Sequence, residues 1–132
     1  MAGPFIVKTV SRIHTGEAAA YRPLAEEICR LAAEREPRLL AFHIYVTDDE
    51  SSEVVIQIHP DAESMQQHLQ VLGEKVRATA EYTDFESLEI YGELNDGLRE
   101  WLPHVTEGIE FTLHSTHWGG FTRLQGADEA GA

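Results

Sequence analysis

Two segments with helical periodicity, separated by two adjacent strand patterns, constrain the fold of this 132-residue chain more than any other feature. Apolar residues in each segment recur at the i, i+3, i+4, i+7 spacing of one helix face. Such a face is stable only when it packs against another element. The apolar positions are Tyr21, Leu24, Ala25, Ile28, Leu31 and Ala32 in the first segment, and Met65, Leu69, Leu72, Val76 and Ala80 in the second.

Runs rich in β-branched and aromatic residues flank these helices and predict strands. The polar loop 48–52 joins the second and third strands as a hairpin. Pro23 is expected in the first turn of the first helix, where its missing N–H loses no hydrogen bond. Asp61 is a suitable N-cap for the second helix, and Pro103 is expected to end a short helix over residues 96–102. The predicted strands cover residues 5–13, 39–47, 53–59, 87–92 and 109–114.

The core order of these elements is strand, helix, strand, strand, helix, strand. This order predicts an α+β, ferredoxin-like fold, in which an antiparallel sheet carries two helices on one face. The elements after residue 92 form a C-terminal extension of this core. We expect residues 1–124 to form a single domain and residues 125–132, which are small and acidic, to form a flexible tail.

Alternation along the strands gives the sheet two different faces. The fully aliphatic positions, such as Val54, Ile56 and Ile58, are expected to meet the helices. The other face mixes aromatic, polar and small apolar side chains, which is typical of an enclosed pocket, although a wet sheet face is the alternative. Two copies packed sheet against sheet would enclose it. The residues assigned to this mixed face are Ala41, His43, Tyr45, Val55, Gln57, His59, Glu89 and Tyr91.

Charge excludes several classes of partner. Lys and Arg number 10 and Asp and Glu number 23, so the formal net charge is −13. Proteins bind nucleic acids and anionic membranes through clustered Lys and Arg side chains, which this acidic chain lacks. We therefore expect neither as a partner. The single cysteine, Cys29, excludes an intramolecular disulfide framework. The chain shows no membrane-spanning apolar run and no signal-peptide pattern, and a cytoplasmic location is expected.

Histidine is the most promising chemical group, because imidazole is the usual general base near neutral pH and the commonest metal ligand. The spacing of His114 and His117 is weak evidence for a metal site, since no carboxylate lies nearby in the sequence. Motifs for nucleophilic hydrolases, phosphate loops, dinucleotide binding and zinc proteases are absent from the sequence. The seven histidines are His14, His43, His59, His68, His104, His114 and His117.

The order of elements, with Gly16 before the first helix and His68 within the second, resembles the antibiotic biosynthesis monooxygenase family of the dimeric α/β-barrel superfamily. In that family the third strand runs into a short acidic turn and then into a helix that carries a histidine about two turns in. Here Ile56-Gln57-Ile58-His59-Pro60-Asp61 and His68 occupy those places. The likeness covers roughly residues 5–92.

The resemblance implies a homodimer whose two sheets form a barrel, and a cofactor-independent monooxygenase. Its substrates are expected to be O₂ and a small electron-rich aromatic molecule such as a quinol or an anthrone. A histidine would remove a proton from the aromatic substrate, and polar residues would orient it. The expected bases are His59, His68 or His43, and the expected substrate-binding residues are Tyr45, Gln57, Glu89 and Tyr91.

Two other functions remain open at this point. The chain is also compatible with a non-catalytic barrel that binds a small molecule or acts in a stress response, because fold does not fix function. A metal-dependent barrel that uses the histidines is the third hypothesis. No cofactor is expected under the first two hypotheses.

Overall fold

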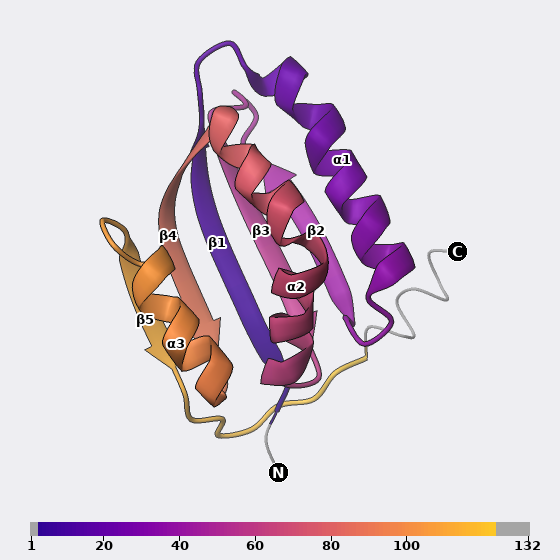
Figure 1. The fold of residues 1–132 in the computed structure, drawn as a ribbon, viewed down its shortest axis with the longest axis vertical. Coiled ribbons are helices and arrows are strands. Elements are labelled where there is room, and N and C mark those ends of the chain that lie inside the picture. The colour runs from indigo at the N-terminus through magenta and orange to yellow at the C-terminus, as the bar shows by residue number, and fades with distance from the viewer. Residues whose placement is uncertain (1–2, 124–132) are drawn as a thin grey trace.

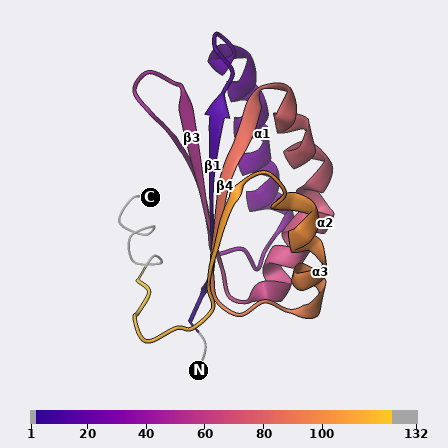
Figure 2. The same cartoon turned by 90° about the vertical axis from the view of Figure 1, so that its left-hand side faces the viewer.

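One five-stranded sheet organises residues 3–123, the part of the chain that the computed structural model describes. Three helices cover one face of this sheet and leave the other face without a layer of its own (Figures 1 and 2). The predicted tail, residues 125–132, lies outside the described residues. The elements are β1 (Phe5–Ile13), α1 (Ala18–Arg35), β2 (Ala41–Val46), β3 (Ser52–His59), α2 (Ala62–Ala78), a 3₁₀ turn (Thr79–Glu81), β4 (Thr83–Tyr91), α3 (Asp96–Val105) and β5 (Glu110–His114).

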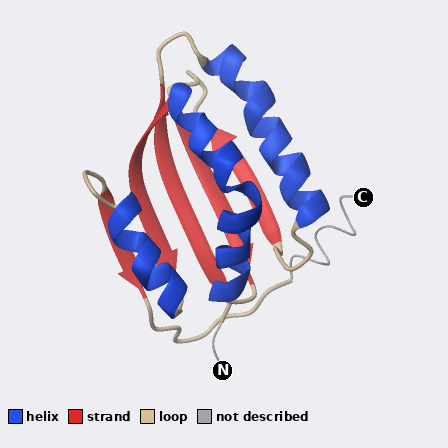
Figure 3. Ribbon diagram, in the orientation of Figure 1, coloured by secondary structure: helices blue, strands red, loops and turns tan. Residues whose placement is uncertain are grey.

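The strand order is β2-β3-β1-β4-β5, and the first four strands pair antiparallel. This is the predicted α+β, ferredoxin-like arrangement. The C-terminal extension adds β5, which pairs with β4 in parallel. A parallel pair needs a crossover, and α3 supplies it on the same face as α1 and α2 (Figure 3). The extension is therefore a β-α-β unit built onto the edge of the core.

The helix-facing side of the sheet holds the main apolar core. Leu88, Ile90 and Leu98 are fully or almost fully buried there, with Phe5 and Val7 of β1 beside them. A second cluster under α1 contains Ile28, Leu31, Ala32 and Leu72. The predicted apolar stripe of α2 is buried only as far as Leu72, because Val76 lies beyond the layer and is exposed.

Both helical prolines lie deeper in their helices than the sequence suggested. Pro23 is in the second turn of α1, and Pro103 lies inside α3 and does not end it. Each ring is exposed, so the carbonyl that loses its N–H partner lies on the wet side of its helix. Packing of the opposite helix face outweighs the lost hydrogen bond.

A substitution at Leu98 tests whether α3 packs into the main apolar core. The side chain is 0% exposed, and its cluster joins α3 to β1 and β4. Leu98→Ala should lower the free energy of unfolding by about 3 kcal/mol, because the large-to-small change leaves a cavity. Chemical denaturation measures the change, with Val71→Ala on the exposed side of α2 as the control, expected to cost well under half as much. Equal effects of the two substitutions would contradict this packing.

Candidate functional site

Strand β3 presents its polar residues to the helices, which is opposite to the orientation predicted from the sequence. Glu53, Gln57 and His59 are buried on the helix side, where they pair in register with Ser11, Val7 and Phe5 of β1. Val54, Ile56 and Ile58 therefore lie on the open face, and the sequence-based orientation was wrong for this strand. The physical reason is that each buried polar group finds a hydrogen-bond partner, so its burial costs little.

His59 uses both of its ring nitrogens within the protein. Its Nδ1 lies 2.7 Å from Ser64 Oγ, and its Nε2 lies 2.9 Å from Gln57 Oε1. An amide oxygen only accepts, so Nε2 carries the hydrogen and Nδ1 accepts from the Ser64 hydroxyl. Burial, together with the nearby His68, lowers the pKa of His59 to about 4. His59 is accordingly a neutral, doubly bonded imidazole at neutral pH.

The local sequence explains why Ser64 reaches this position. Asp61 is the N-cap of α2, and its side chain accepts a hydrogen bond from the Ser64 backbone N–H at 3.0 Å, as the sequence predicted. This bond begins the helix two residues after β3 ends and directs the first turn of α2 toward His59. Arg38 forms an ion pair with Asp61 from outside, which lowers the pKa of the aspartate and keeps it an acceptor.

His68 and Glu36 form the most deeply buried ion-pair geometry in the described residues. Nδ1 of His68 lies 2.8 Å and 3.0 Å from the two carboxylate oxygens of Glu36, and both side chains are at most 2% exposed. An ionised carboxylate only accepts, so Nδ1 donates. No residue between 3 and 123 forms a hydrogen bond to Nε2 of His68. That nitrogen keeps a free lone pair in the neutral ring, as the base of a carboxylate–histidine dyad does.

Two aromatic rings lie close to the His68 imidazole. The ring of His59 meets it edge-on at 6.2 Å between centroids, and the ring of Phe42 lies at 5.7 Å. Phe42 is half-buried on β2, the edge strand, and belongs to the partly buried apolar side chains around α1. The dyad thus lies between one neutral imidazole and an apolar margin of the sheet. We call Glu36, His68, His59, Gln57 and Ser64 the buried polar network.

A second buried polar pair lies at the other end of β3, where the strand begins. Tyr21 of α1 donates its hydroxyl hydrogen to Glu53, and both side chains are buried. Burial raises the pKa of Glu53 and, with the Glu53 contact, that of Tyr21. The pair ties α1 to β3 in the same layer as the buried polar network.

The open face carries the other predicted site residues. Tyr91 donates to Glu89 at 2.7 Å, and Lys8 lies 3.5 Å from the same carboxylate. The Tyr91 hydrogen bond and the Lys8 charge lower the pKa of Glu89. His114 of β5 stacks on Tyr91 at 4.7 Å between ring centroids, a contact that the sequence analysis did not propose.

His43 and Tyr45 lie at the opposite edge of that open face. Their rings are 6.1 Å apart on β2, and both are exposed, Tyr45 by 61%. His43 pairs in register with Ile56, whereas Phe42 pairs with Gln57, so His43 points away from His59. The prediction that His43 and His59 share one face was therefore wrong.

The structure divides the predicted site into two groups. It brings His59, His68 and Gln57 together beneath the helices, and it places His43, Tyr45, Glu89 and Tyr91 on the open face. Sequence reasoning missed Glu36 and Ser64. The N-cap motif that begins at Asp61 was a signal for Ser64. Glu36 had none, because it follows a run of exposed charges at the end of α1.

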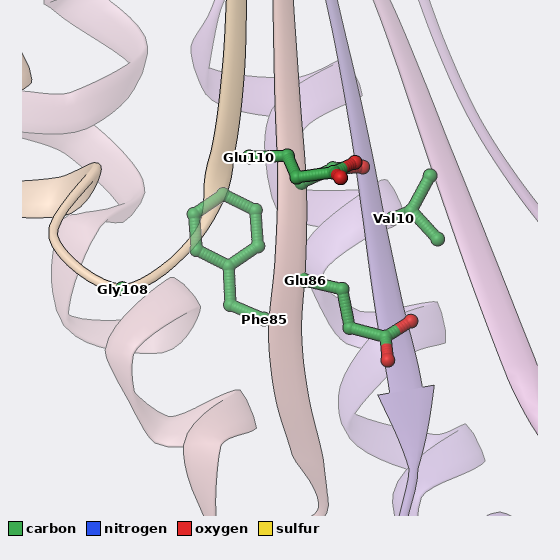
Figure 4. Close-up of a pocket in the computed structure, with 6 residues that line it drawn as sticks. Val10, Phe85, Glu86, Gly108 and Glu110 are labelled. Carbon is green, nitrogen blue, oxygen red and sulfur yellow. The ribbon is translucent and has the colours of Figure 1, made fainter.

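Two hollows on the surface are lined by other residues. One, of about 560 Å³, lies on the open face over β4 and β5, and its lining includes Val10, Phe85, Glu86 and Glu110 (Figure 4). The other, of about 360 Å³, lies beside α2 at Arg38 and Gln67. Neither hollow is lined by a histidine.

Residues 3–123 contain no group of three or more His, Cys, Asp or Glu side chains arranged to hold a metal ion. Within the same residues, no helix combines the length and apolar character needed to cross a bilayer.

Comparison with known proteins shows the fold. No protein-family profile matches the sequence, and no curated protein matches it. Solved structures do match. MupZ from Pseudomonas fluorescens superimposes with a TM-score of 0.73 at 14% identity, covering 95% of this chain and 93% of that one. This match includes the β-α-β extension, because coverage of that extent leaves out few residues.

Two further structures match the core of the chain. An antibiotic biosynthesis monooxygenase matches with a TM-score of 0.58 at 18% identity, over 69% of this chain and 99% of that one. SnoaB from Streptomyces nogalater, a cofactor-independent oxygenase, matches with a TM-score of 0.59 at 16% identity, over 70% and 94%. The chain therefore has the fold of antibiotic biosynthesis monooxygenases, as the sequence resemblance implied, and the β-α-β extension is additional to that core.

The pKa of His59 leads to a pH prediction. The unfolded chain binds this proton near the ordinary histidine pKa of about 6.5, whereas the folded chain binds it near 4. Between these pH values the unfolded state holds more protons, so stability is lost as the pH falls. The contribution should approach about 1.4 kcal/mol per pH unit. Denaturation between pH 7 and pH 4.5 measures it.

His59→Gln should remove this part of the pH dependence, and His104→Gln on the exposed side of α3 should not. Glu53 acts in the opposite direction, because its raised pKa makes the folded state more stable as the pH falls. The comparison is therefore made between variants at matched pH. An unchanged slope in His59→Gln would show that this imidazole titrates normally in the folded protein.

Proposed function

We propose that the chain is a cofactor-independent monooxygenase that acts on a small electron-rich aromatic substrate such as a quinol or an anthrone. The observation that carries the proposal is the buried Glu36–His68 dyad, whose Nε2 has no hydrogen-bond partner among residues 3–123. The likeness in fold to SnoaB, a cofactor-independent oxygenase, supports the reaction class.

The proposed first step is a proton transfer to His68. Nε2 accepts the proton of the substrate, and the Glu36 carboxylate stabilises the imidazolium that forms. The resulting anion is electron-rich enough to reduce O₂ directly. For an anthrone, one oxygen atom of O₂ becomes the new carbonyl and the other leaves as water, together with the two hydrogens that the substrate carbon loses. The electrons balance within this exchange, and no other reductant is required.

His59 has a supporting part in this proposal. Because both of its nitrogens are already bonded, it holds the neighbouring His68 ring in place and presents a neutral surface beside it. The substrate approaches on the side of Phe42, where the apolar side chains of the β2 edge provide a dry margin. This proposal assigns the base to His68 rather than to His43, which lies on the other face.

Turnover tests the dyad. With an accepted quinol or anthrone, His68→Gln should lower kcat about 100-fold and leave KM within a few-fold, because a positioned base contributes roughly 10²–10⁴-fold. Glu36→Gln keeps an oxygen that accepts from Nδ1 but removes the counter-charge, and it should give a smaller fall in kcat. Oxygen uptake measures both rates.

The control for these variants is His104→Gln on the exposed side of α3, which should keep the parent rate. Circular dichroism and a melting curve show whether each variant is folded, since breaking a buried pair is often destabilising. If a folded His68→Gln turns over within a few-fold of the parent, the dyad is not the base. A chain that binds aromatics without oxygen uptake would instead be the non-catalytic barrel.

We also propose that the chain forms a homodimer through the open face of its sheet. The side chains of Ile6, Val10, Val54, Ile56 and Ile58 form an apolar centre on that face and are only half-buried in one copy. Lys8 lies among them on β1, opposite Ile56, and pairs with Glu89. Monomers rarely leave an apolar patch of this kind in water. The two-sheet packing that results is the barrel implied by the family resemblance, and it buries Tyr45, Glu89 and Tyr91 between the copies.

Light scattering at micromolar concentration should return twice the mass of one chain. Ile56→Glu places a charge at the centre of the face and should yield monomers, because the desolvation of an unpaired charge costs several kcal/mol. Val76→Glu, on the exposed side of α2, is the matched control and should stay dimeric. A monomeric parent protein would overturn the dimer without bearing on the His68 assay.

A further inference from the structure

The segment that follows β5 has an unusual surface. Residues 115–123, which we call the arm, leave the end of β5 and pass around the end of the sheet at which β1 begins. They then lie on the side opposite the helices (Figure 2). The His117 ring lies so close to Gly3 that a Cβ added to this glycine would clash with it. Beyond this contact, Trp118 is 97% exposed and Phe121 is 80% exposed. Two large aromatic side chains of the arm are thus left exposed in a single copy.

The chemistry of the arm contrasts with that of the rest of the chain. It contains no Asp or Glu, although the chain as a whole has a net charge of −13. Its one permanent charge is Arg123, whose guanidinium lies 4.5 Å from the centre of the Phe121 ring. This is cation–π geometry, and it makes the two side chains a single unit, aromatic on one side and cationic on the other.

A complementary hollow exists on the open face, between β4 and β5. Its volume of about 560 Å³ lies within the range of small-molecule and side-chain pockets. Phe85 and Val10 form its apolar walls, and the carboxylates of Glu86 and Glu110 both point over the sheet toward β1 (Figure 4). An aromatic wall with two carboxylates suits an aromatic–guanidinium unit, through ring stacking and charge-assisted hydrogen bonds.

The arm leads away from the hollow of its own chain. Gly108 and Glu110 mark the hollow at the start of β5, whereas the arm begins at the opposite end of that strand. From there it runs past the N-terminal end of β1 toward the β2 edge of the sheet (Figure 1). Within residues 3–123 the arm does not line this hollow. We take the occupant to be the arm of a second copy packed on the open face.

We propose that the arm docks on a second copy of the chain, with the Phe121–Arg123 unit seated in the β4–β5 hollow against Glu86 and Glu110. This inference rests on the proposed homodimer and adds a reciprocal clamp to it. In a two-fold assembly each copy gives one arm and receives one. The arm also explains why a strongly acidic chain tolerates face-to-face packing, since each copy offers a cation to the carboxylates of the other.

Cross-linking between two different chains tests the contact. In a Cys29→Ser background, one chain carries Phe121→Cys and the other, with a tag that changes its size, carries Phe85→Cys. The two are mixed, allowed to exchange subunits and oxidised. We expect a disulfide-linked heterodimer in severalfold excess over the control pair, in which Glu100→Cys on the exposed side of α3 replaces Phe85→Cys.

Two outcomes would overturn the proposal. One is a heterodimer yield no greater than that of the control pair. The other is an internal cross-link in a single chain that carries both cysteines, at a dilution where no cross-linked dimer forms, because the arm would then cover its own hollow. Light scattering on the same samples separates the proposals: a dimer without this cross-link overturns the arm alone, and the His68 rate is unaffected by either result.

Charge exchange gives an independent measurement. Arg123→Glu should weaken the dimer about three- to tenfold, as removal of a charge pair at the rim of an interface does. Adding Glu86→Arg and Glu110→Arg to the same chain should restore at least part of the affinity. Glu100→Arg is the control with the same change of charge. A dimer constant that Arg123→Glu leaves unchanged would contradict the docking.

Discussion

The burial of three polar side chains of β3 beneath the helices is the constraint on which the rest of the structure depends. Glu53, Gln57 and His59 enter a layer that is otherwise apolar, and a buried polar group without a partner costs several kcal/mol. Their partners come from different elements: Tyr21 from α1 and Ser64 from α2, while Gln57 and His59 bond to each other. The two long helices are therefore positioned by hydrogen bonds as well as by apolar contact.

The same orientation of β3 determines what the protein presents to the outside. Because its polar residues face inward, Val54, Ile56 and Ile58 face outward and give the open face an apolar centre. A chain with so many carboxylates would otherwise be expected to stay monomeric through charge repulsion. The proposed dimer and the proposed arm both follow from this arrangement: the apolar centre supplies the driving force, and the arm supplies the cations.

The two buried histidines illustrate how environment separates their chemistry. His59 and His68 are neighbours with similar burial, yet every nitrogen of His59 is bonded, whereas His68 has a carboxylate on one nitrogen and no described partner on the other. The first arrangement fixes a neutral ring, and the second suits proton transfer. The distinction depends on Glu36, which the turn after α1 brings inward to contact α2.

The sequence by itself determined the order of the elements and the fold class. Periodicity in α1 and α2, β-branched runs in the strands and the Asp61 cap are local properties, so they are readable without the tertiary structure. His59 and Gln57 became candidates through an assignment to the mixed face that the structure overturned, and His68 through the family resemblance. Local signals alone did not select them. Neither the sequence pattern nor the resemblance identified Glu36, whose partner is 32 residues away in the sequence.

Only the tertiary structure decided which face of β3 meets the helices. Its alternate positions are Val54, Ile56 and Ile58 on one side and Glu53, Val55, Gln57 and His59 on the other, and hydrophobicity alone favours burial of the first set. A shift of one residue in register exchanges the two sets between the faces. Which set is buried therefore depends on the register of β3 with β1 and β2 and on the hydrogen-bond partners that the helices provide. Those partners lie on α1 and α2, and no pattern along the strand records them.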